Sequence, residues 1–527
     1  MTTTEDLETA AEQLPPVMAQ PATAPGAGGL RRVLAPVWAD RRLGVANAVM
    51  LAAGFGLFSA LLTPRGPVTT GQALVAMAVA LIVGTGAGLA TGSRWSLLIT
   101  PVVFAAVFEL GRIGTSGPTV DGIHLDSLLG SIAFSVGRGV HGILVFIPML
   151  VGSTFGIWLA GRLGRRATPA PGPAGWIIVG LLAVGVAVIA LSIARPASTA
   201  PILGTDGEPL AGSVAELVAV PIGDHDQTLM IRGRSVDGPV LLYLAGGPGG
   251  TDIGALRADT TLEEHFVVVT WDQRGAGKSY TALDPIDTLT LDQAVADAIE
   301  VTNYLRERFD EEKVYIVGNS WGTTLGILAA QQHPEMVHAY VGTGQMVSQR
   351  ETDVMFWEDT LAWADRTGKT GLAEKLRSNG PPPYDDVTRY EYATSHEHDW
   401  NTYAEFDPET EMPAILFVPE YTWMDRINGF RGFFDSAAVL YPQLQDIDFR
   451  VDVPRLDVPL YMVVGEHEAR GRAVLADEWF NLVEAPSKER VVFAGAGHRP
   501  HFDRPALFAE VMTRVLADTY VETARGT

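Results

Sequence analysis

The chain of 527 residues contains no cysteine. This absence excludes disulfides, thiol catalysis and cysteine-ligated zinc, but it identifies no compartment, because cysteine-free proteins occur on both sides of a membrane. Lysine is missing from residues 1–195, where 12 arginines stand against 8 acidic residues. The rest of the chain carries 26 basic and 53 acidic residues, a net charge of −27. So acidic a segment argues against nucleic acid as a partner.

Charge is also nearly absent from five apolar stretches, each close to the roughly 20 residues that cross a bilayer. They lie at about Leu43–Leu62, Ala73–Ala90, Trp95–Gly111, Gly142–Gly161 and Trp176–Ala194. Five such runs favour membrane spans over the buried helices of a soluble domain. Glu109, near the end of the third, is expected to reach toward the interface rather than to relay protons. Glycines at 54–56 and 84–88 are expected to let helices approach closely.

Arginine placement orients these spans. If the spans alternate, only Arg65 and Arg112 fall on one side, and eight arginines fall on the other: Arg31, Arg32, Arg41, Arg42, Arg94, Arg162, Arg165 and Arg166. We therefore expect a multi-pass protein of the cell membrane with a disordered cytoplasmic tail over residues 1–40. An odd number of spans places the chain beyond Arg195 outside the cytoplasm, and one miscounted span would reverse this. No signal peptide with a cleavage site is recognisable.

The composition changes after residue 195. Three prolines and two glycines between 195 and 210 mark a linker. From about Ser213, short apolar runs alternate with helical segments, which predicts an α/β domain with a mostly parallel sheet. The expected division is a transmembrane helical domain at 41–195, a linker at 196–212, a core at 213–345 and 451–527, and an insertion at 346–450.

The most informative stretch begins with four β-favouring residues, 314–317, which run into Gly318-Asn319-Ser320-Trp321-Gly322 and then into a helix-compatible segment. It predicts the strand, sharp turn and helix of a nucleophile elbow. The serine must occupy a strained turn with its hydroxyl exposed, so the positions two before and two after it must be small. The helix that follows points its positive N-terminal end at a developing oxyanion.

A second glycine-rich stretch follows the strand predicted at Val240–Leu244. Its residues are Ala245-Gly246-Gly247-Pro248-Gly249-Gly250. Consecutive glycines after a strand could bind phosphate, but this run has neither dinucleotide-binding spacing nor the Lys-Ser/Thr of a P-loop. It is better interpreted as part of an oxyanion hole, in which N–H groups of Gly246 and Gly247 act together with that of Trp321.

Three motifs occur in order: Gly246-Gly-Pro-Gly249, Trp271-Asp-Gln-Arg-Gly-Ala-Gly-Lys-Ser279 and Gly318-Asn-Ser-Trp-Gly322. Together they resemble the motif series of the prolyl iminopeptidase family of α/β-hydrolases, over roughly residues 210–520 and not over the membrane half. The resemblance implies an α/β-hydrolase fold, a helical cap over 346–450, and removal of N-terminal proline or related residues. The family usually has a non-catalytic histidine where this chain has Ala245.

The remaining catalytic candidates lie after the insertion. A strand predicted at Pro459–Val464 precedes Gly465-Glu466-His467-Glu468, and one at Arg490–Phe493 precedes a small-residue loop that ends in His498. The order serine, acid, histidine is the one this fold uses. The family position of the acid falls on Glu468, where most relatives have aspartate, and Glu466 is the alternative. His501 is expected to be a loop or surface residue. A metal site formed by His498 and His501 would need further ligands.

These residues predict a serine hydrolase with a Ser320–His498–Glu468 triad, without metal or cofactor. The family motifs favour an aminopeptidase acting on small peptide or aminoacyl substrates. An esterase, lipase or amide hydrolase acting on small esters or lipidic compounds is the alternative, and a membrane sensor or transporter with an inactive hydrolase domain is a second one.

An aminopeptidase must recognise a protonated amine, and a carboxylate in the pocket is a simple means. The family takes such acids from the cap. Glu420, Tyr421 and Asp425 are therefore candidate substrate-binding residues, with Glu420 as the partner of the amine. A solvated cap helix with an aromatic core face is the competing interpretation of this stretch.

Overall fold

Beyond the linker, eight strands form one sheet in the order β1-β2-β4-β3-β5-β6-β7-β8. The computed structural model describes residues 27–164 and 172–520, and its strands are β1 Val214–Ile222, β2 His225–Gly233, β3 Val240–Leu244, β4 Val267–Asp272, β5 Val314–Asn319, β6 Val337–Thr343, β7 Leu460–Gly465 and β8 Lys488–Phe493. β2 runs antiparallel to both β1 and β4, and every later pairing is parallel. The predicted, mostly parallel sheet is confirmed.

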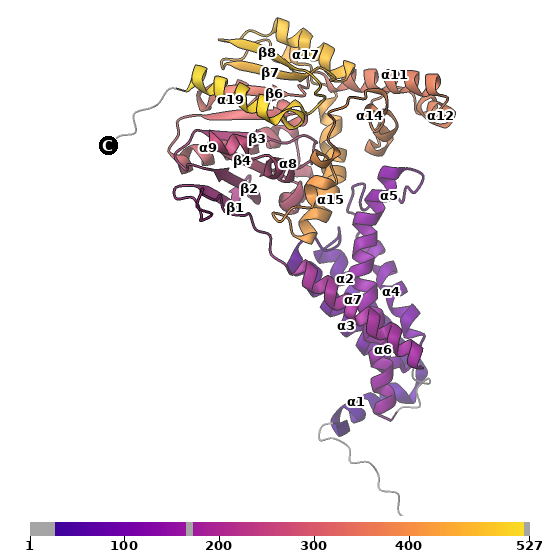
Figure 1. The fold of residues 1–527 in the computed structure, drawn as a ribbon. Helices are drawn as coiled ribbons and strands as arrows, with labels where there is room; N and C mark the ends of the chain where they lie inside the picture. Colours follow the sequence, from indigo (N-terminus) through magenta and orange to yellow (C-terminus); the bar gives the residue numbers. More distant parts are fainter. Residues whose placement is uncertain (1–26, 165–171, 521–527) are drawn as a thin grey trace, which may run out of the picture.

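Helices cover both faces of this sheet (Figure 1). Successive side chains of a strand point to opposite faces, and β3 shows the result. Its Leu242 and Leu244 lie in a core cluster with α9 (Leu291–Phe309), α10 (Trp321–Gln332) and α17 (Arg470–Leu482). Leu241 and Tyr243 lie in the opposite cluster with α8 (Ile253–Ala258) and α19 (Pro505–Thr519). With both faces covered, the carboxyl edge of the strands is the place for a site.

The insertion between β6 and β7 is built from helices, as expected of a cap. The longer ones are α11 (Gln349–Thr367), α12 (Thr370–Asn379) and α15 (Trp423–Leu440), and the short ones are α13 (Glu391–Thr394), α14 (Glu397–Trp400) and α16 (Phe449–Asp452). Figure 1 shows α15 between the sheet and the apolar helices of the first half.

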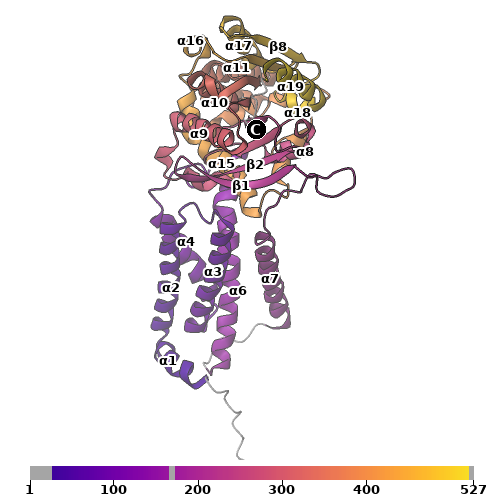
Figure 2. The ribbon, with the colours of Figure 1, turned by 90° about the vertical axis from the view of Figure 1, so that its left-hand side faces the viewer.

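The apolar stretches form a helical bundle on one side of the α/β domain (Figure 2). Its helices are α2 (Arg41–Leu62), α3 (Thr70–Thr91), α4 (Ser96–Gly111), α6 (Val140–Arg162) and α7 (Pro173–Ile193). α5 (Leu128–Phe134) and a π-helical segment, Ser135–Gly139, precede α6 without a break, so one helix of 35 residues runs from Leu128 to Arg162. At 1.5 Å per residue it is about 52 Å long, which exceeds the roughly 30 Å of a bilayer core.

Four of the five predicted spans lie on helices long and apolar enough to cross a membrane: α2, α3, the helix 128–162 and α7. The third is shorter than predicted, because α4 has only 16 residues, or about 24 Å. α4 nevertheless runs parallel to α2, with Gly56 against Phe104 and Gly111 against Ala60. Arg112, just after α4, donates a hydrogen bond to the carbonyl of Pro64, just after α2 (3.2 Å).

Two further expectations need correction. The tail expected to be disordered over residues 1–40 contains helix α1 (Ala27–Ala39), and residues 1–26 lie outside the described residues, as do Arg165 and Arg166. The expected close approach at glycine holds for α3, where a methyl group at Gly84 or Gly88 would lie 2.1 Å from a carbonyl oxygen of α6. It is wrong for Gly54, which has no neighbouring atom within 4 Å of its Cβ position.

The bundle and the cap meet in a buried, polar contact. Arg431 of α15 is fully buried and donates to the carbonyls of Pro67 (2.7 Å) and Val136 (2.9 Å). Asn428 donates to the carbonyl of Val68 (2.7 Å). Because a buried polar group without a partner is costly, these bonds hold the cap against one end of the bundle. We call the end of the bundle that contains Pro67, Val68 and Val136 the hydrolase end, and we call the opposite end of the bundle the far end.

Candidate active site

Ser320 lies at the sharp turn between β5 and α10, with φ of 51° and ψ of −120°. Positive φ is strained for a residue other than glycine, and such strain is concentrated at functional sites. A methyl group at Gly318 would lie 2.6 Å from the carbonyl oxygen of Gly322, and one at Gly322 would lie 2.0 Å from that of Leu244. Both glycines therefore permit the close approach that the predicted elbow requires. The N–H of Ser320 donates to the carbonyl of Thr343 (3.1 Å), which ties the turn to β6.

The loop after β3 lies beside the elbow. A methyl group at Gly246 would lie 3.3 Å from Ser320 Cβ, and Gly247 has a φ of 143° that favours glycine. Trp321 is the first residue of α10, so its N–H is among those without a partner inside the helix. The three predicted oxyanion donors thus lie next to the predicted nucleophile.

Gln273, which the sequence did not single out, joins these two segments. Its Oε1 accepts a hydrogen bond from Trp321 Nε1 (2.8 Å), and its Nε2 donates to the carbonyl of Ala245 (3.2 Å). Gln273 is buried and belongs to the Trp-Asp-Gln-Arg motif after β4. The position of that motif at the carboxyl edge of the sheet was the signal that could have identified it.

The predicted acid and histidine are in contact: His498 Nδ1 lies 3.0 Å from Glu468 Oε2. The Glu468 side chain is 3% exposed and also accepts a hydrogen bond from Arg472 Nε (2.7 Å). Burial raises the pKa of Glu468, but the charges and hydrogen bonds of Arg472 and His498 outweigh burial and lower that pKa to about 2. Glu468 is therefore ionised at neutral pH, the state that can orient an imidazole and stabilise its protonated form.

Arg472 is a second residue that the sequence did not single out. It is buried and pairs with both Glu468 and Glu397. In the sequence, the one local sign that Arg472 pairs with the acid was its position four residues after Glu468, at the start of α17.

His498 also lies close to the elbow. Its carbonyl accepts a hydrogen bond from Asn319 Nδ2 (3.4 Å), and a methyl group at Gly344 would lie 2.6 Å from its Cε1. Within residues 27–164 and 172–520, no hydrogen bond links the Ser320 hydroxyl to the imidazole. Such bonds are often long in the absence of substrate and tighten when it binds.

Glu466 and His501, the other acid and histidine considered in the sequence, have partners outside the contact between Glu468 and His498. Glu466 is exposed and accepts a hydrogen bond from the N–H of Gly495 (2.9 Å). His501 is buried, with its Nε2 2.8 Å from the Tyr243 hydroxyl. The expectation of a loop or surface histidine is therefore wrong, because the short helix α18 (Pro500–Asp503) turns the ring inward toward Phe508.

The three cap residues predicted to bind substrate have other partners. Glu420 is fully buried and accepts a hydrogen bond from Arg257 Nε (3.0 Å). The Tyr421 hydroxyl donates to the aspartate of the Trp-Asp-Gln-Arg motif (2.9 Å), and Asp425 pairs with Lys278 (2.7 Å). These contacts tie the cap to the core. In the part of the chain that the structure describes, none of the three forms a hydrogen bond or an ion pair with Ser320 or His498.

A cavity of about 100 Å³ opens beside the oxyanion turn. Its lining includes Gly247 of the turn, Leu129 of α5 and four aromatic residues of the cap: Tyr390, Phe433, Phe434 and Tyr441. Glu391 also lines it, and its two carboxylate oxygens accept the N–H groups of Leu128 (3.1 Å) and Leu129 (2.9 Å). A helix of the bundle thus forms one wall of this cavity, which no motif in the sequence indicated.

Comparison with known proteins identifies the family. Residues 239–505 match the family described as "alpha/beta hydrolase fold". A probable aminopeptidase of Bacillus subtilis (strain 168), YbaC, is 29% identical over 306 residues, which are 57% of this chain and 96% of that protein. A proline iminopeptidase of Lactobacillus delbrueckii subsp. bulgaricus is 21% identical over 300 residues, 56% of this chain and 95% of that protein.

Among solved structures, the proline iminopeptidase of Mycobacterium smegmatis is similar, with a TM-score of 0.43 at 19% identity over 58% of this chain and 98% of its own. The family match spans half of the sequence. The chain therefore belongs to the α/β-hydrolase family, and it is of the prolyl iminopeptidase-like type.

Proposed function

We propose that this chain is a membrane-anchored serine hydrolase of aminopeptidase type that cleaves an acyl bond with Ser320, His498 and Glu468. The observation that supports it most is the pair of the buried Glu468 and His498, 3.0 Å apart, in which the carbonyl of His498 accepts a hydrogen bond from Asn319 of the elbow. A sensor or transporter with an inactive hydrolase domain would have no need of this pair together with the elbow and both oxyanion segments.

The proposed chemistry follows from these positions. His498 removes the proton from Ser320 as the hydroxyl oxygen attacks the substrate carbonyl, while Glu468 holds the imidazole through Nδ1. The oxyanion accepts N–H bonds from Trp321 and from the turn at 246–247, and losing one such donor costs on the order of 10²-fold in rate. His498 then protonates the leaving group, and water hydrolyses the acyl-enzyme by the same steps. None of them requires a metal or a cofactor.

We propose a small peptide or aminoacyl compound with a free amine as the substrate. Two of the similar proteins are named as an aminopeptidase and a proline iminopeptidase. The charges between cap and bundle agree with a cationic substrate, because six acidic residues and two basic ones line the hollows there: Asp121, Asp126, Asp385, Asp386, Glu391 and Asp399 against Lys375 and Arg389. An acidic entrance raises the local concentration of cations.

Glu420 stays a prediction as the partner of the amine. Its Oε1 is paired with Arg257, and its buried Oε2 has no hydrogen-bond partner among the described residues. If Oε2 receives the amine, Glu420→Gln lowers kcat/KM for free aminoacyl substrates and leaves their N-acetylated forms unchanged. An equal loss of kcat/KM for the free and the N-acetylated substrates would show that Glu420 stabilises the cap and does not bind the amine.

The test of the function is a substrate panel on the purified, full-length protein. Aminoacyl arylamides, their N-acetylated forms and neutral esters are compared, with Ser320→Ala as the blank. We expect hydrolysis of the free aminoacyl compounds and much slower hydrolysis of the acetylated ones. We also expect a fluorophosphonate probe to label the protein, but not Ser320→Ala. Equal rates on blocked and free substrates would overturn the aminopeptidase proposal.

One observation favours a second candidate, an esterase or lipase. The cavity beside the oxyanion turn is lined by aromatic side chains and by Leu129, and such a lining suits an apolar acyl group. Activity confined to neutral esters in the same panel would support this candidate.

A further inference from the structure

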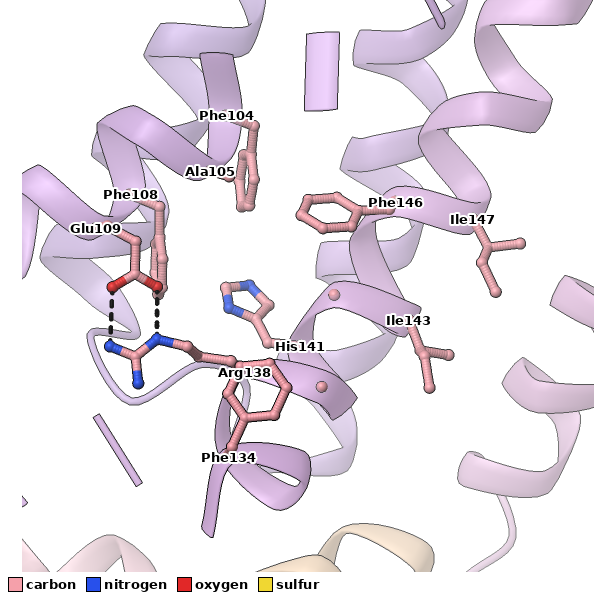
Figure 3. A pocket seen from close by; sticks show the side chains of 12 residues that line it. Phe104, Ala105, Phe108, Glu109, Phe134, Arg138, His141, Ile143, Phe146 and Ile147 are labelled. Atoms are coloured by element: carbon pink, nitrogen blue, oxygen red, sulfur yellow. Dashed lines mark hydrogen bonds and ion pairs between the residues drawn. The ribbon is translucent and has the colours of Figure 1, made fainter. Parts of the chain in front are cut away.

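A separate cavity of about 470 Å³ lies in the bundle, between α4 and α6 and at the hydrolase end. Figure 3 shows its apolar walls. Phe104 and Phe108 come from α4, Ile143, Phe146 and Ile147 come from α6, and Phe134 comes from the end of α5. Such a volume lies in the range of small-molecule sites, which are mostly apolar with a few placed polar groups.

Polar groups gather at one end of this cavity. His141 lines it, and only 5% of this residue is exposed. The imidazole meets the rings of Phe104 and Phe108 edge-on, with centroids 5.7 and 4.5 Å away, and it has no hydrogen-bond partner among the described residues. Buried polar side chains are nearly always hydrogen-bonded, because an unmade bond costs free energy. An unpartnered imidazole in a cavity wall therefore indicates a ligand with a polar atom at this point.

A charged pair lies beside the imidazole. Arg138 and Glu109 form two hydrogen bonds of 3.1 Å (Figure 3). Arg138 also donates to the carbonyls of Val120 (2.6 Å) and Asp121 (2.8 Å). Most N–H groups of the guanidinium are thus in use. Glu109 also accepts two hydrogen bonds from Arg112 (3.2 and 2.6 Å), so these three side chains carry one net positive charge but offer few free donors. The site suits an uncharged acceptor such as an ester carbonyl better than a free phosphate, which would need several donors.

We propose that this cavity binds the ester-linked acyl chain of a membrane glycerolipid, with an ester oxygen at His141 and the chain along Phe104, Phe146 and Ile147. The proposal rests on the membrane insertion proposed above and not on the triad. A glycerolipid supplies an apolar chain for the walls of the cavity and an ester oxygen for His141. Its ester groups lie near the end of the hydrocarbon layer, and the cavity likewise lies near one end of the bundle, where α4 ends and α6 begins. Around the cavity, exposed apolar side chains such as Val102 and Ile143 lead to the lipid-facing surface.

The same site is linked to the cap. Phe134, Arg138 and Gly139 of the cavity wall flank or belong to the π-helical segment Ser135–Gly139, and such segments are frequent at functional sites. The carbonyl of Val136, in the same segment, accepts a hydrogen bond from the buried Arg431 of α15. A bound lipid therefore supports the segment that holds the cap.

The test is photocrosslinking of the full-length protein in phosphatidylcholine nanodiscs that contain a phosphatidylcholine with a diazirine in its acyl chain. Peptide mapping should find label on α4 and α6 around the cavity. Gly142 lines the cavity, and a methyl group there would make an ordinary contact of 3.4 Å with the Phe146 ring. We expect Gly142→Leu, which fills the space, to lower this label by about tenfold.

Gly54→Leu is the matched control, because Gly54 faces outward from α2 with nothing within 4 Å, and its label should equal that of the wild type. His141→Phe keeps the ring and removes the polar atoms, so it should lower the label several-fold even if Gly142→Leu does not fold. Melting temperatures identify a variant that is unfolded. Label spread evenly over all outward-facing helices, or unchanged in both cavity variants, would overturn the proposal. Protein recovered without detergent would instead contradict the membrane insertion.

Discussion

Thr119 of the bundle and Asp435 of cap helix α15 are joined by two hydrogen bonds, from the Thr119 N–H to Oδ1 (3.1 Å) and from its hydroxyl to Oδ2 (2.6 Å). Tyr280 of the core also donates to Oδ2 (2.6 Å), and Arg65 lies 3.5 Å from it. One buried carboxylate therefore connects bundle, core and cap.

The first prediction concerns this carboxylate. Asp435→Ala leaves the buried Arg65 with Asp284 alone, and removing one partner of a buried ion pair typically costs about 3–5 kcal/mol. Thr119→Val keeps the shape and removes one hydrogen bond, which costs about 1 kcal/mol. Thermal unfolding of the full-length protein should rank the melting temperatures as wild type, Thr119→Val, Asp435→Ala, from high to low. Equal melting temperatures would show that the bundle and the cap do not stabilise each other.

Local geometry explains which parts of the site the sequence could predict. Gly318 and Gly322 must flank the elbow serine because backbone atoms come too close for a side chain, and this spacing is visible in the sequence. By contrast, Arg431 meets Pro67 and Val136 across 364 and 295 residues. No local pattern encodes such a pairing, so the contact between bundle and cap was not predictable.

The cap residues show a second limit. Acidic and aromatic residues at 420–425 fit a binding site and a packed interface equally well. The directions of Glu420 and Asp425 depend on Arg257 of α8 and on Lys278 of the 3-10 helix Gly277–Leu283, both far away in the sequence. Gly54 is similar: a glycine on an apolar helix permits close approach, but only the fold decides whether a neighbour is there.

The second prediction concerns the two candidate acids. Glu468→Gln removes the charge that faces His498, while Glu466→Gln changes an exposed residue whose carboxylate accepts a hydrogen bond from a loop N–H. Loss of the acid in such triads lowers kcat by roughly 10⁴-fold. We expect a loss of this size for Glu468→Gln and near-normal turnover for Glu466→Gln, with either the best substrate of the panel or a fluorophosphonate probe. The reverse order would assign the acid to Glu466.

The third prediction concerns pH and uses the same residue. The pKa of Glu468 is about 2 in the folded protein, below its ordinary value of 4.5. A depressed carboxyl pKa contributes stability that is complete above about pH 4.5 and is lost as pH falls toward 2. Glu468→Gln lacks this contribution. The melting temperature of the wild type should therefore fall toward that of Glu468→Gln between pH 5 and 3, whereas Glu466→Gln should follow the wild type. A constant difference across this range would mean that Glu468 is not held by its positive neighbours.

The last prediction concerns which end of the bundle faces the cytoplasm, and the contacts of the bundle supply further observations on this point. Residues 64–68, 112–121 and the chain after α7 lie at the hydrolase end, as their contacts with the cap, the core and each other show. The turn at 92–95 and the start of α7 lie at the far end. Arginines at the hydrolase end pair with acids: Arg65 pairs with Asp284, and Arg112 and Arg138 share Glu109.

Arginines of the bundle are more numerous at the far end, where Arg31, Arg32, Arg41, Arg42, Arg94 and Arg162 lie, and we therefore expect that end to be cytoplasmic. Because the chain has no cysteine, single cysteines can report this directly. Ser116→Cys places an exposed thiol at the hydrolase end, and Gly172→Cys places one at the far end, before α7. A membrane-impermeant maleimide added to intact, wall-stripped cells should label Ser116→Cys at once and Gly172→Cys only after lysis. Labelling of Gly172→Cys alone in intact cells would place the hydrolase domain in the cytoplasm.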